Sequence, residues 1–218
     1  MSEHAADNLY ADHNRMANHW WWRPGWQMGT QFYAWHITLD GQDDLHRLMD
    51  AYSEALQPFP TLDPVPRQWR HITLQGLGHV EDVTDADRRS AVAAVAARLA
   101  HLQPIKSTFG RPVVFKEAIA LPPSKPNTYA KLRREIRAGI ADAWGFTPEK
   151  NEGFRAHTSV AYSNSKADGR AIRLALDEAN VSPATATFAA VSLIRMNRDH
   201  RMYEWTTVDA VNLGPSSH

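Results

Sequence analysis

Short runs in which hydrophobic and polar residues alternate make up much of this chain, and segments with an apolar residue at every third or fourth position separate them. Alternation is typical of a half-buried β-strand, and the longer period is typical of an amphipathic helix. The pattern predicts, in order, strand 31–39, helix 43–56, strand 68–80, helix 84–102, strand 105–109, strand 113–121, helix 127–144, strand 154–162, helix 168–180, and strands 185–195 and 202–211.

The order of these elements repeats. Residues 31–109 read strand, helix, strand, helix, strand, and residues 113–195 read the same, with the strand at 202–211 left over. Residue identity between the halves is slight, so the repeat rests on element order and on a shared motif. We expect an α+β fold of two lobes with a cleft between them, rather than a barrel of alternating βα units.

The N-terminal residues differ from this body. Residues 1–19 are polar without a clear period and predict a loose or partly ordered arm. Trp20, Trp21, Trp22 and Trp26 follow, and we expect them to pack onto the body as a hydrophobic latch. The alternative is that one indole reaches the ligand cleft and stacks on a base. The predicted division is an arm at 1–30, a bilobal domain with intertwined lobes at 31–211, and a tail at 212–218.

Composition narrows the function classes. The chain has 24 basic and 24 acidic residues, so its formal net charge is zero, whereas a protein that binds long nucleic acid usually has an excess of basic residues on its surface. A small ligand, or only the end of a nucleic acid, is therefore expected. The absence of cysteine excludes disulfides, thiolate nucleophiles and cysteine-based zinc sites. With no apolar run of roughly 18 residues and no signal-peptide pattern, we expect a cytoplasmic protein without a membrane partner.

Two of the predicted strands carry the same short motif. His71 and Thr73 lie in one, His157 and Ser159 in the other, and residues two apart on a strand share a face. Imidazoles exchange protons near neutral pH, so two of them on opposite sides of a phosphorus can act as base and acid. The two hydroxyl groups can stabilise charge on the phosphate oxygens. This scheme needs no metal.

Neighbouring residues can be placed by the same alternation. Trp69 and Gln75 fall on the face of His71, and Arg155 falls on the face of His157. Arg155 could hold a phosphate oxygen and Trp69 could stack on a base. A solvated arginine and a tryptophan at the rim or in the core are equally good interpretations.

His36 lies in a run, Trp35 to Leu39, that repeats the run from Trp69 to Leu74 except for Arg70. By sequence it is a rival for the first catalytic histidine. It lies, however, on the opening strand of the first half, and the corresponding strand 113–121 has no histidine. We therefore expect an auxiliary, substrate-contacting role for His36, or a histidine satisfied within the sheet.

The runs from His71 to Gly78 and from Phe154 to Tyr162 resemble the paired His-x-Thr/Ser motifs of the 2′-5′ RNA ligase-like, two-histidine phosphoesterase superfamily. The resemblance covers roughly residues 31–211 and includes the order of elements. It implies two pseudo-twofold-related lobes, each an antiparallel sheet flanked by helices, around an active-site cleft. Ala156 departs from the family pattern, which often has proline there.

The resemblance also implies an activity: metal-independent cleavage of 2′,3′-cyclic or related cyclic phosphates on RNA ends or nucleotides, with no cofactor. Some members of the superfamily join RNA ends through 2′-5′ linkages. The catalytic residues carried over from the motifs are His71, Thr73, His157 and Ser159. The expected partner is a nucleotide or RNA end that carries a cyclic phosphate.

Two other classes of function stay open. One is a protein that binds a nucleotide or RNA end without turnover, although a pure binder has no need of two titratable imidazoles. The other is a metallohydrolase that uses some of the 11 histidines. That class ranks third, because no His-Glu-x-x-His motif is present and no carboxylate flanks His71 or His157. The natural substrate, the direction of reaction and the oligomeric state are left open.

Overall fold

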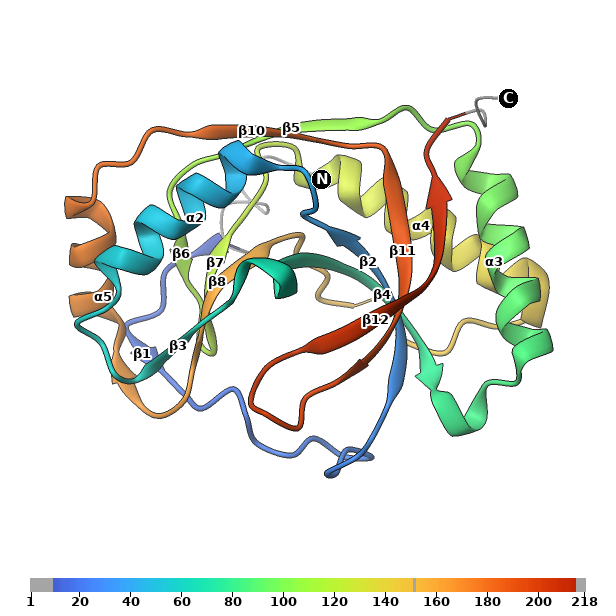
Figure 1. Cartoon of the computed structure of the whole chain (residues 1–218), viewed down its shortest axis with the longest axis horizontal. Helices are drawn as coiled ribbons and strands as arrows, with labels where there is room; N and C mark the ends of the chain where they lie inside the picture. Colours follow the sequence, from blue (N-terminus) through green and yellow to red (C-terminus); the bar gives the residue numbers. More distant parts are fainter. Residues whose placement is uncertain (1–9, 151, 215–218) are drawn as a thin grey trace.

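The computed structural model describes residues 10–150 and 152–214, and within them the main feature is an eight-stranded antiparallel sheet (Figure 1). Its strands follow one another in space as β12 (Glu204–Asn212), β11 (Ala190–Asn197), β2 (Phe32–Thr38), β4 (His71–His79), β8 (Thr158–Ser163), β7 (Ala118–Leu121) and β6 (Val113–Val114), and β3 (Leu62–Pro64) also pairs with β8. Two smaller pairs join β5 (Ile105–Phe109) to β10 (Ala184–Phe188), and β1 (Arg15–Met16) to β9 (Ala167–Asp168).

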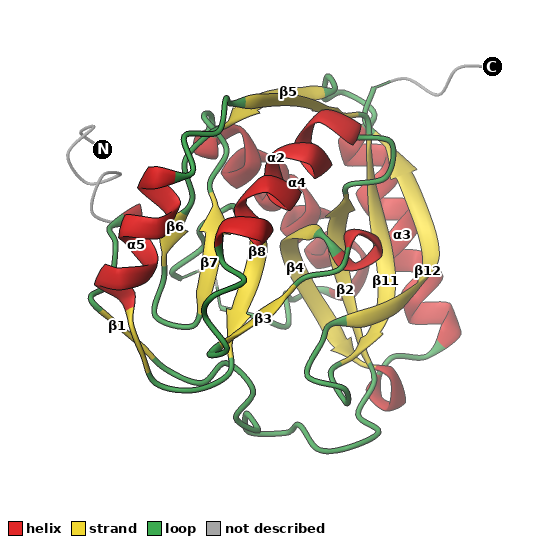
Figure 2. Ribbon diagram, turned by 60° about the vertical axis from the view of Figure 1, so that its left-hand side comes forward, coloured by secondary structure: helices red, strands yellow, loops and turns green. Residues whose placement is uncertain are grey.

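In the described part of the chain, four α-helices accompany the strands: α2 (Asp43–Ala55), α3 (Asp85–Leu99), α4 (Pro126–Trp144) and α5 (Gly169–Glu178). Helix α5 lies at one end of the molecule and α3 at the other (Figure 1, Figure 2). The boundaries follow local chemistry, because the Thr84 hydroxyl accepts a hydrogen bond from the Asp87 amide, and Gly145 closes α4 with a φ of 77°. Helices α3 and α4 pack closely at Gly139, where a Cβ atom would lie 2.8 Å from the Val95 backbone.

The two halves of the chain are interleaved. Helix α2 contacts β8 and β10, and helix α4 contacts β4. Each motif-bearing strand is therefore covered by a helix from the other half of the sequence. The predicted α+β class with antiparallel sheets is confirmed.

The core lies between these helices and one face of the sheet. Side chains that alternate along the strands fill it, among them Trp35, Ile37, Ile72 and Val160, each at most 1% exposed. Burying a large apolar side chain contributes roughly 1.5–3 kcal/mol. Because strand side chains alternate, the residues between these core positions face away from the helices.

Most predicted elements are present, but two predicted strands are each divided. Region 113–121 forms a hairpin of β6 and β7, in which the Phe115 amide donates to the Ala118 carbonyl at 2.8 Å. Region 185–195 contributes to β10 and β11, which belong to different sheets. Apolar residues continue through both breaks, so the hydrophobic pattern does not indicate where a strand changes its pairing partner. The strands predicted at 68–80 and 154–162 begin later, at His71 and Thr158, and a 3₁₀ turn (η2, Arg67–Trp69) precedes β4.

The N-terminal segment, from residue 10 onward, is held against the body. The His13 and Ala17 amides donate to carbonyls of the β6–β7 hairpin at 2.7 Å, and β1 pairs with β9. Of the loose or partly ordered arm expected at residues 1–19, residues 10–19 are ordered against the body, and residues 1–9 lie outside the described part. Trp20 packs against Tyr162 as a latch would, whereas Trp21 and Trp22 are about half exposed.

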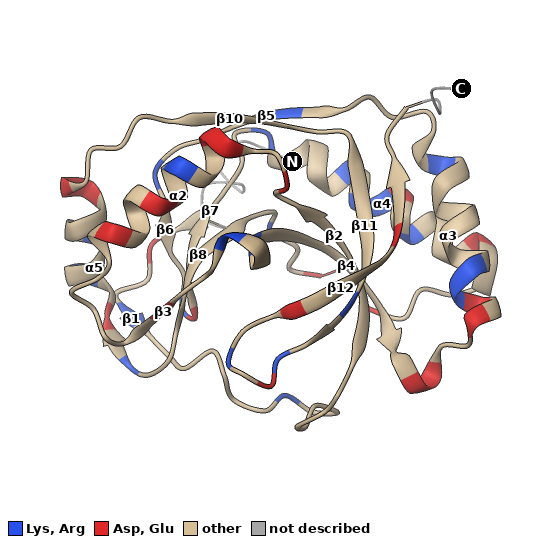
Figure 3. Cartoon of the chain, viewed as in Figure 1, with Lys and Arg blue, Asp and Glu red and all other residues tan. Residues whose placement is uncertain are grey.

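Charged residues of both signs lie on the helices and connecting loops, and the central strands carry few of them (Figure 3). Among the described residues, none of the helices has the length and apolar character needed to cross a membrane.

Candidate active site

The two motif strands meet in the middle of the sheet. β4 pairs with β8 at Ile72 and Thr158, whose side chains are fully buried. In each strand the motif histidine precedes this pair by one residue, and the motif hydroxyl residue follows it by one. All four motif side chains, His71, Thr73, His157 and Ser159, line one cavity of about 580 Å³. The sequence prediction that the two motifs face the same cleft agrees with this placement.

Each motif histidine is oriented by a backbone carbonyl two residues earlier. His71 Nδ1 donates to the Trp69 carbonyl at 2.8 Å, and His157 Nδ1 donates to the Arg155 carbonyl at 2.7 Å. Because a carbonyl only accepts, Nδ1 carries the proton in the neutral ring, and Nε2 is the nitrogen with a free lone pair. The matching contacts give both imidazoles the tautomer that a general base needs.

Burial keeps both rings neutral. It lowers the pKa of His71 to about 4, against the opposing effect of the bond to the Trp69 carbonyl, and His157, when protonated, lowers it further. Burial also lowers the pKa of His157, and the Arg155 cation adds to this while the Arg155 carbonyl opposes it. A bound phosphate anion would raise both pKa values, since an opposite charge favours the protonated form. An anion bound in the cavity would therefore favour a protonated imidazole there.

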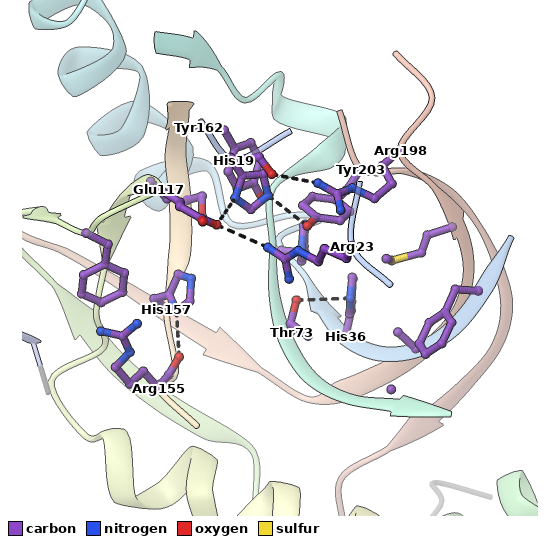
Figure 4. A pocket seen from close by; sticks show the side chains of 18 of the residues that line it. His19, Arg23, His36, Thr73, Glu117, Arg155, His157, Tyr162, Arg198 and Tyr203 are labelled. Carbon is purple, nitrogen blue, oxygen red and sulfur yellow. Dashed lines mark hydrogen bonds and ion pairs between the residues drawn. The ribbon is translucent and has the colours of Figure 1, made fainter. Parts of the chain in front are cut away.

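His36 lies directly against His71. The two imidazole rings are parallel, with centroids 4.2 Å apart and an interplanar angle of 1°. His36 is 1% exposed, lines the cavity, and has Nε2 3.3 Å from Thr73 Oγ1. Burial holds the pKa of His36 well below its ordinary value, and His71 lowers it further. His36 therefore contacts both parts of the first motif, and Figure 4 shows its contact with Thr73.

The remaining neighbours that the sequence analysis placed on the motif faces lie in different surroundings. Arg155 lines the cavity, with its guanidinium 4.2 Å from the centroid of the Phe115 ring. Trp69 belongs to the 3₁₀ turn η2, and its indole contacts Trp205 at 4.9 Å between ring centroids. It is not among the described residues that line the cavity.

Gln75 does not share the face of His71. A bulge at Leu74 shifts the pairing, so that Thr73 pairs with His36 but Gln75 pairs with the core residue Trp35. The side chain of Gln75 is buried and donates to Glu149 at 3.0 Å. An inserted residue reverses the alternation, and for this reason the assignment from the sequence was wrong.

Trp26 lines the cavity, which agrees with the alternative that one indole of the tryptophan-rich segment reaches it. Other cavity-lining residues were missed by the sequence analysis: Arg23 comes from the N-terminal segment, and Arg198 and Tyr203 come from the turn between β11 and β12. His19 also lines the cavity, stacked on Tyr162 at 4.4 Å between ring centroids (Figure 4). The tryptophan-rich segment indicated that its indoles pack onto the body, but no local pattern indicated that Arg23, His19 and the β11–β12 turn would meet at the cavity.

The cavity is positively charged although the chain is neutral. Arg23, Lys116, Arg155 and Arg198 line it, against the carboxylates of Glu117 and Glu149. Such a surface favours an anionic ligand. In the part of the chain that the structure describes, no three histidine, aspartate or glutamate side chains are grouped as a metal site would require.

The chain resembles several solved structures in fold. The protein TT0787 of Thermus thermophilus superposes with a TM-score of 0.64 at 16% identity, covering 86% of this chain and 100% of that one. Escherichia coli LigT complexed with 3′-AMP gives 0.61 at 14% identity, covering 84% and 98%. The Agrobacterium tumefaciens protein ATU0111, of unknown function, gives 0.55 at 11% identity, covering 82% and 85%. At these identities the likeness concerns the fold alone.

Sequence comparison identifies the family. No curated protein sequence matches the chain. The family model described as the 2′-5′ RNA ligase superfamily matches residues 42–200, a span that includes both motifs. The paired motifs, the antiparallel sheet that joins them and this match agree with one another, and the chain belongs to the 2′-5′ RNA ligase superfamily.

Proposed function

We propose that this protein is a metal-independent phosphoesterase that opens 2′,3′-cyclic or related cyclic phosphates on RNA ends or nucleotides. The main support is the matched placement of His71 and His157. Each precedes the Ile72–Thr158 pair by one residue, each is oriented through Nδ1, and both line the same cavity. Superfamily membership supports the same class of reaction.

In the proposed reaction the cyclic phosphate lies between the two imidazoles. One neutral histidine takes the proton of an attacking water through Nε2 as the new P–O bond forms. The other histidine, protonated under the influence of the phosphate, gives its proton to the ribose oxygen as the ring P–O bond breaks. One water is consumed, and a phosphomonoester and a free ribose hydroxyl are formed.

The hydroxyl groups of Thr73 and Ser159 would donate to the non-bridging oxygens, where charge develops. Arg155 would hold one of these oxygens, and His36 would contact the substrate or position His71. For Trp69 we propose a positioning role through its carbonyl, since this oxygen accepts from His71 whereas the indole packs on Trp205.

We also propose that the two halves of the fold are related by symmetry. The equivalent positions of the two motifs support a pseudo-twofold relation between two lobes within residues 31–211, with the cleft between them.

In a ligation reaction an RNA 5′-hydroxyl would take the place of water, and the same pair of histidines would act as base and acid. Structures of E. coli LigT complexed with 3′-AMP, with ATP and with NADP⁺ support a nucleotide as the ligand of this protein.

The test is a screen of 2′,3′-cyclic nucleotides and RNA with a 2′,3′-cyclic phosphate end, with and without exhaustive chelation. We expect turnover that survives chelation, and a product that is entirely one isomer, the 2′- or the 3′-phosphate. Loss on chelation with rescue by a divalent cation would favour a metallohydrolase. Saturable binding without any turnover would favour a binding protein.

A further inference from the structure

One wall of the cavity is built by two segments that the motif chemistry does not use. His19, Arg23 and Trp26 come from the N-terminal segment, which lies outside the span that matches the family. Arg198 and Tyr203 come from the turn between β11 and β12. Figure 4 shows His19, Arg23, Arg198 and Tyr203 grouped on one side of the cavity, away from Arg155.

Arg198 is a buried cation. It is 4% exposed, and its guanidinium donates to the His19 carbonyl at 2.9 Å. The guanidinium also lies 5.4 to 5.7 Å from the centroids of three aromatic rings, those of Tyr203, Trp20 and Trp26. Among the described residues, no carboxylate lies within ion-pair distance of it. Aromatic faces offset only part of the cost of burying a cation, so Arg198 is placed to accept an anion.

Arg23 lines the same wall. One terminal nitrogen lies 3.4 Å from a carboxylate oxygen of Glu117, and Nε is buried with no hydrogen-bond partner in the described part of the chain. His19 adds no charge, because burial and the cations of Arg23 and Arg198 lower its pKa to about 3. Its contact with Glu117 at 3.4 Å is therefore not an ion pair at neutral pH. Glu117 thus balances at most one of the two guanidinium groups.

The distance from this wall to the catalytic histidines is short. The Tyr203 ring lies 6.0 Å from the His71 ring and 5.4 Å from the Arg198 guanidinium. Tyr203 is therefore close to both His71 and Arg198, and one nucleotide unit can bridge the span between these two groups. A 2′,3′-cyclic phosphate ends an RNA chain on its 3′ side, so any second phosphate lies on the 5′ side.

We propose that Arg23 and Arg198 form a second anion subsite, which binds the 5′-phosphate group of the nucleotide whose cyclic phosphate lies between His71 and His157. The assignment of the nucleotide rests on the proposed function. The group bound is either a terminal phosphomonoester or the phosphodiester that joins the preceding nucleotide. The N-terminal segment thereby selects substrates that carry two phosphates over nucleosides that carry one.

Binding tests this subsite without requiring turnover. Calorimetric titration at fixed ionic strength compares 3′-AMP with adenosine 3′,5′-bisphosphate. A charge-assisted contact to the added phosphate predicts at least about 10-fold tighter binding of the bisphosphate. Arg198→Met and Arg23→Gln should each reduce this ratio to below about 3. Equal affinities in the wild type would overturn the proposal. Arg23 is partly exposed, so its variant decides the question even where Arg198→Met does not fold.

Two control variants separate a built subsite from a general electrostatic effect. Lys116→Gln removes another cation from the same cavity, and Arg195→Met makes the Arg198 change at an exposed position of β11 outside the cavity. Both should keep most of the bisphosphate preference. If Lys116→Gln reduces the ratio as far as Arg23→Gln does, the preference comes from overall charge and the subsite assignment is wrong.

Turnover then identifies the source of the second phosphate. The substrates are adenosine 2′,3′-cyclic phosphate, its 5′-phosphorylated form, and the dinucleotide ApA with a 2′,3′-cyclic end. A higher kcat/KM for the second substrate alone assigns a terminal monoester, and a higher value for the dinucleotide assigns an internal diester. Bisphosphate preference without turnover on any of them would contradict the proposed function but not the subsite. Turnover with equal binding of the two ligands would contradict the subsite alone.

Discussion

At the scale of single residues, the proposed chemistry depends on which ring nitrogen of each histidine is free. In both His71 and His157, Nδ1 donates a hydrogen bond to the carbonyl two residues earlier, at 2.8 and 2.7 Å. This contact fixes the ring, sets the tautomer and leaves Nε2 for proton transfer. The same backbone feature therefore prepares both histidines for either role.

Replacing either histidine should remove most of the activity. His71→Ala and His157→Ala should each lower kcat/KM by about 10²–10⁴, since each removes one general acid or base. The double variant should fall little further, because the two groups act as a unit. Steady-state kinetics on the best cyclic phosphate measures this, and His200→Ala, at an exposed turn, is the control. A folded single variant with near-full activity would show that the acid–base assignment is wrong.

His36→Ala should have a smaller effect. The stack on His71 and the contact with Thr73 hold the first motif in place, and an aromatic pair contributes about 0.5–1.5 kcal/mol. We therefore expect kcat/KM to fall by about 3- to 10-fold, and His36→Phe to recover much of this loss by restoring the stack. Kinetics on both variants checks the prediction. The assignment fails if His36→Ala is as inactive as His157→Ala while His71→Ala still turns over.

At the scale of elements, strand pairing decides which side chains reach the cavity. Two register shifts interrupt the pairing of β2 with β4, and the one at Leu74 turns Gln75 toward the core side. The pairing of β4 with β8 at Ile72 and Thr158 brings the two motifs onto one surface. The hairpin of β6 and β7 carries Glu117 to the rim of the cavity, where it pairs with Arg23.

The β4–β8 junction also contains a buried polar group whose removal should stabilise the fold. Thr158 is fully buried, and its hydroxyl has no hydrogen-bond partner among the described residues. Thr158→Val keeps the shape and removes the unpaired group, so the free energy of unfolding should rise by about 1 kcal/mol. Urea denaturation measures this. Thr185→Val, where the hydroxyl contacts Thr108, is the matched control and should give no gain. A loss of stability in Thr158→Val would mean that its hydroxyl is satisfied.

At the scale of the whole molecule, the buried histidines make stability depend on pH. The pKa values of His19 and His71 fall to about 3 and about 4 in the folded protein, and burial also lowers those of His36 and His157. In the unfolded chain these groups bind protons near pH 6.5. The unfolded state therefore binds more protons below that pH, and acid favours it.

We expect the urea midpoint to be highest near neutral pH and to fall as the pH decreases from about 6.5 to 4. His71 alone should account for a loss of roughly 3 kcal/mol over this window. His71→Gln, which cannot be protonated, should show a shallower decrease than the wild type. Denaturation at pH 7.0, 5.5 and 4.5 provides the test. A midpoint independent of pH, or an identical slope in His71→Gln, would contradict the buried, neutral state of the ring.

The sequence by itself determined the local features. Period-two alternation showed that His71 and Thr73 share a face, and the repeated order of elements placed His157 as the counterpart of His71. The helices α2 to α5 were predicted within a few residues of their ends, since amphipathic spacing and caps such as Thr84 are local signals. The α+β class followed from these elements, because each apolar face must be buried against another.

Only the tertiary structure decided which of these features meet. The bulge at Leu74, the change of sheet between β10 and β11, and the stack of His36 on His71 depend on pairing between distant segments. Hydrophobic period does not encode such pairing, because an alternating strand is compatible with many partners. The wall that contains Arg23 and Arg198 joins residues 175 positions apart in the sequence. The Arg198 guanidinium is buried only after the aromatic side chains have packed around it, so the free-energy cost of that burial is a property of the tertiary structure.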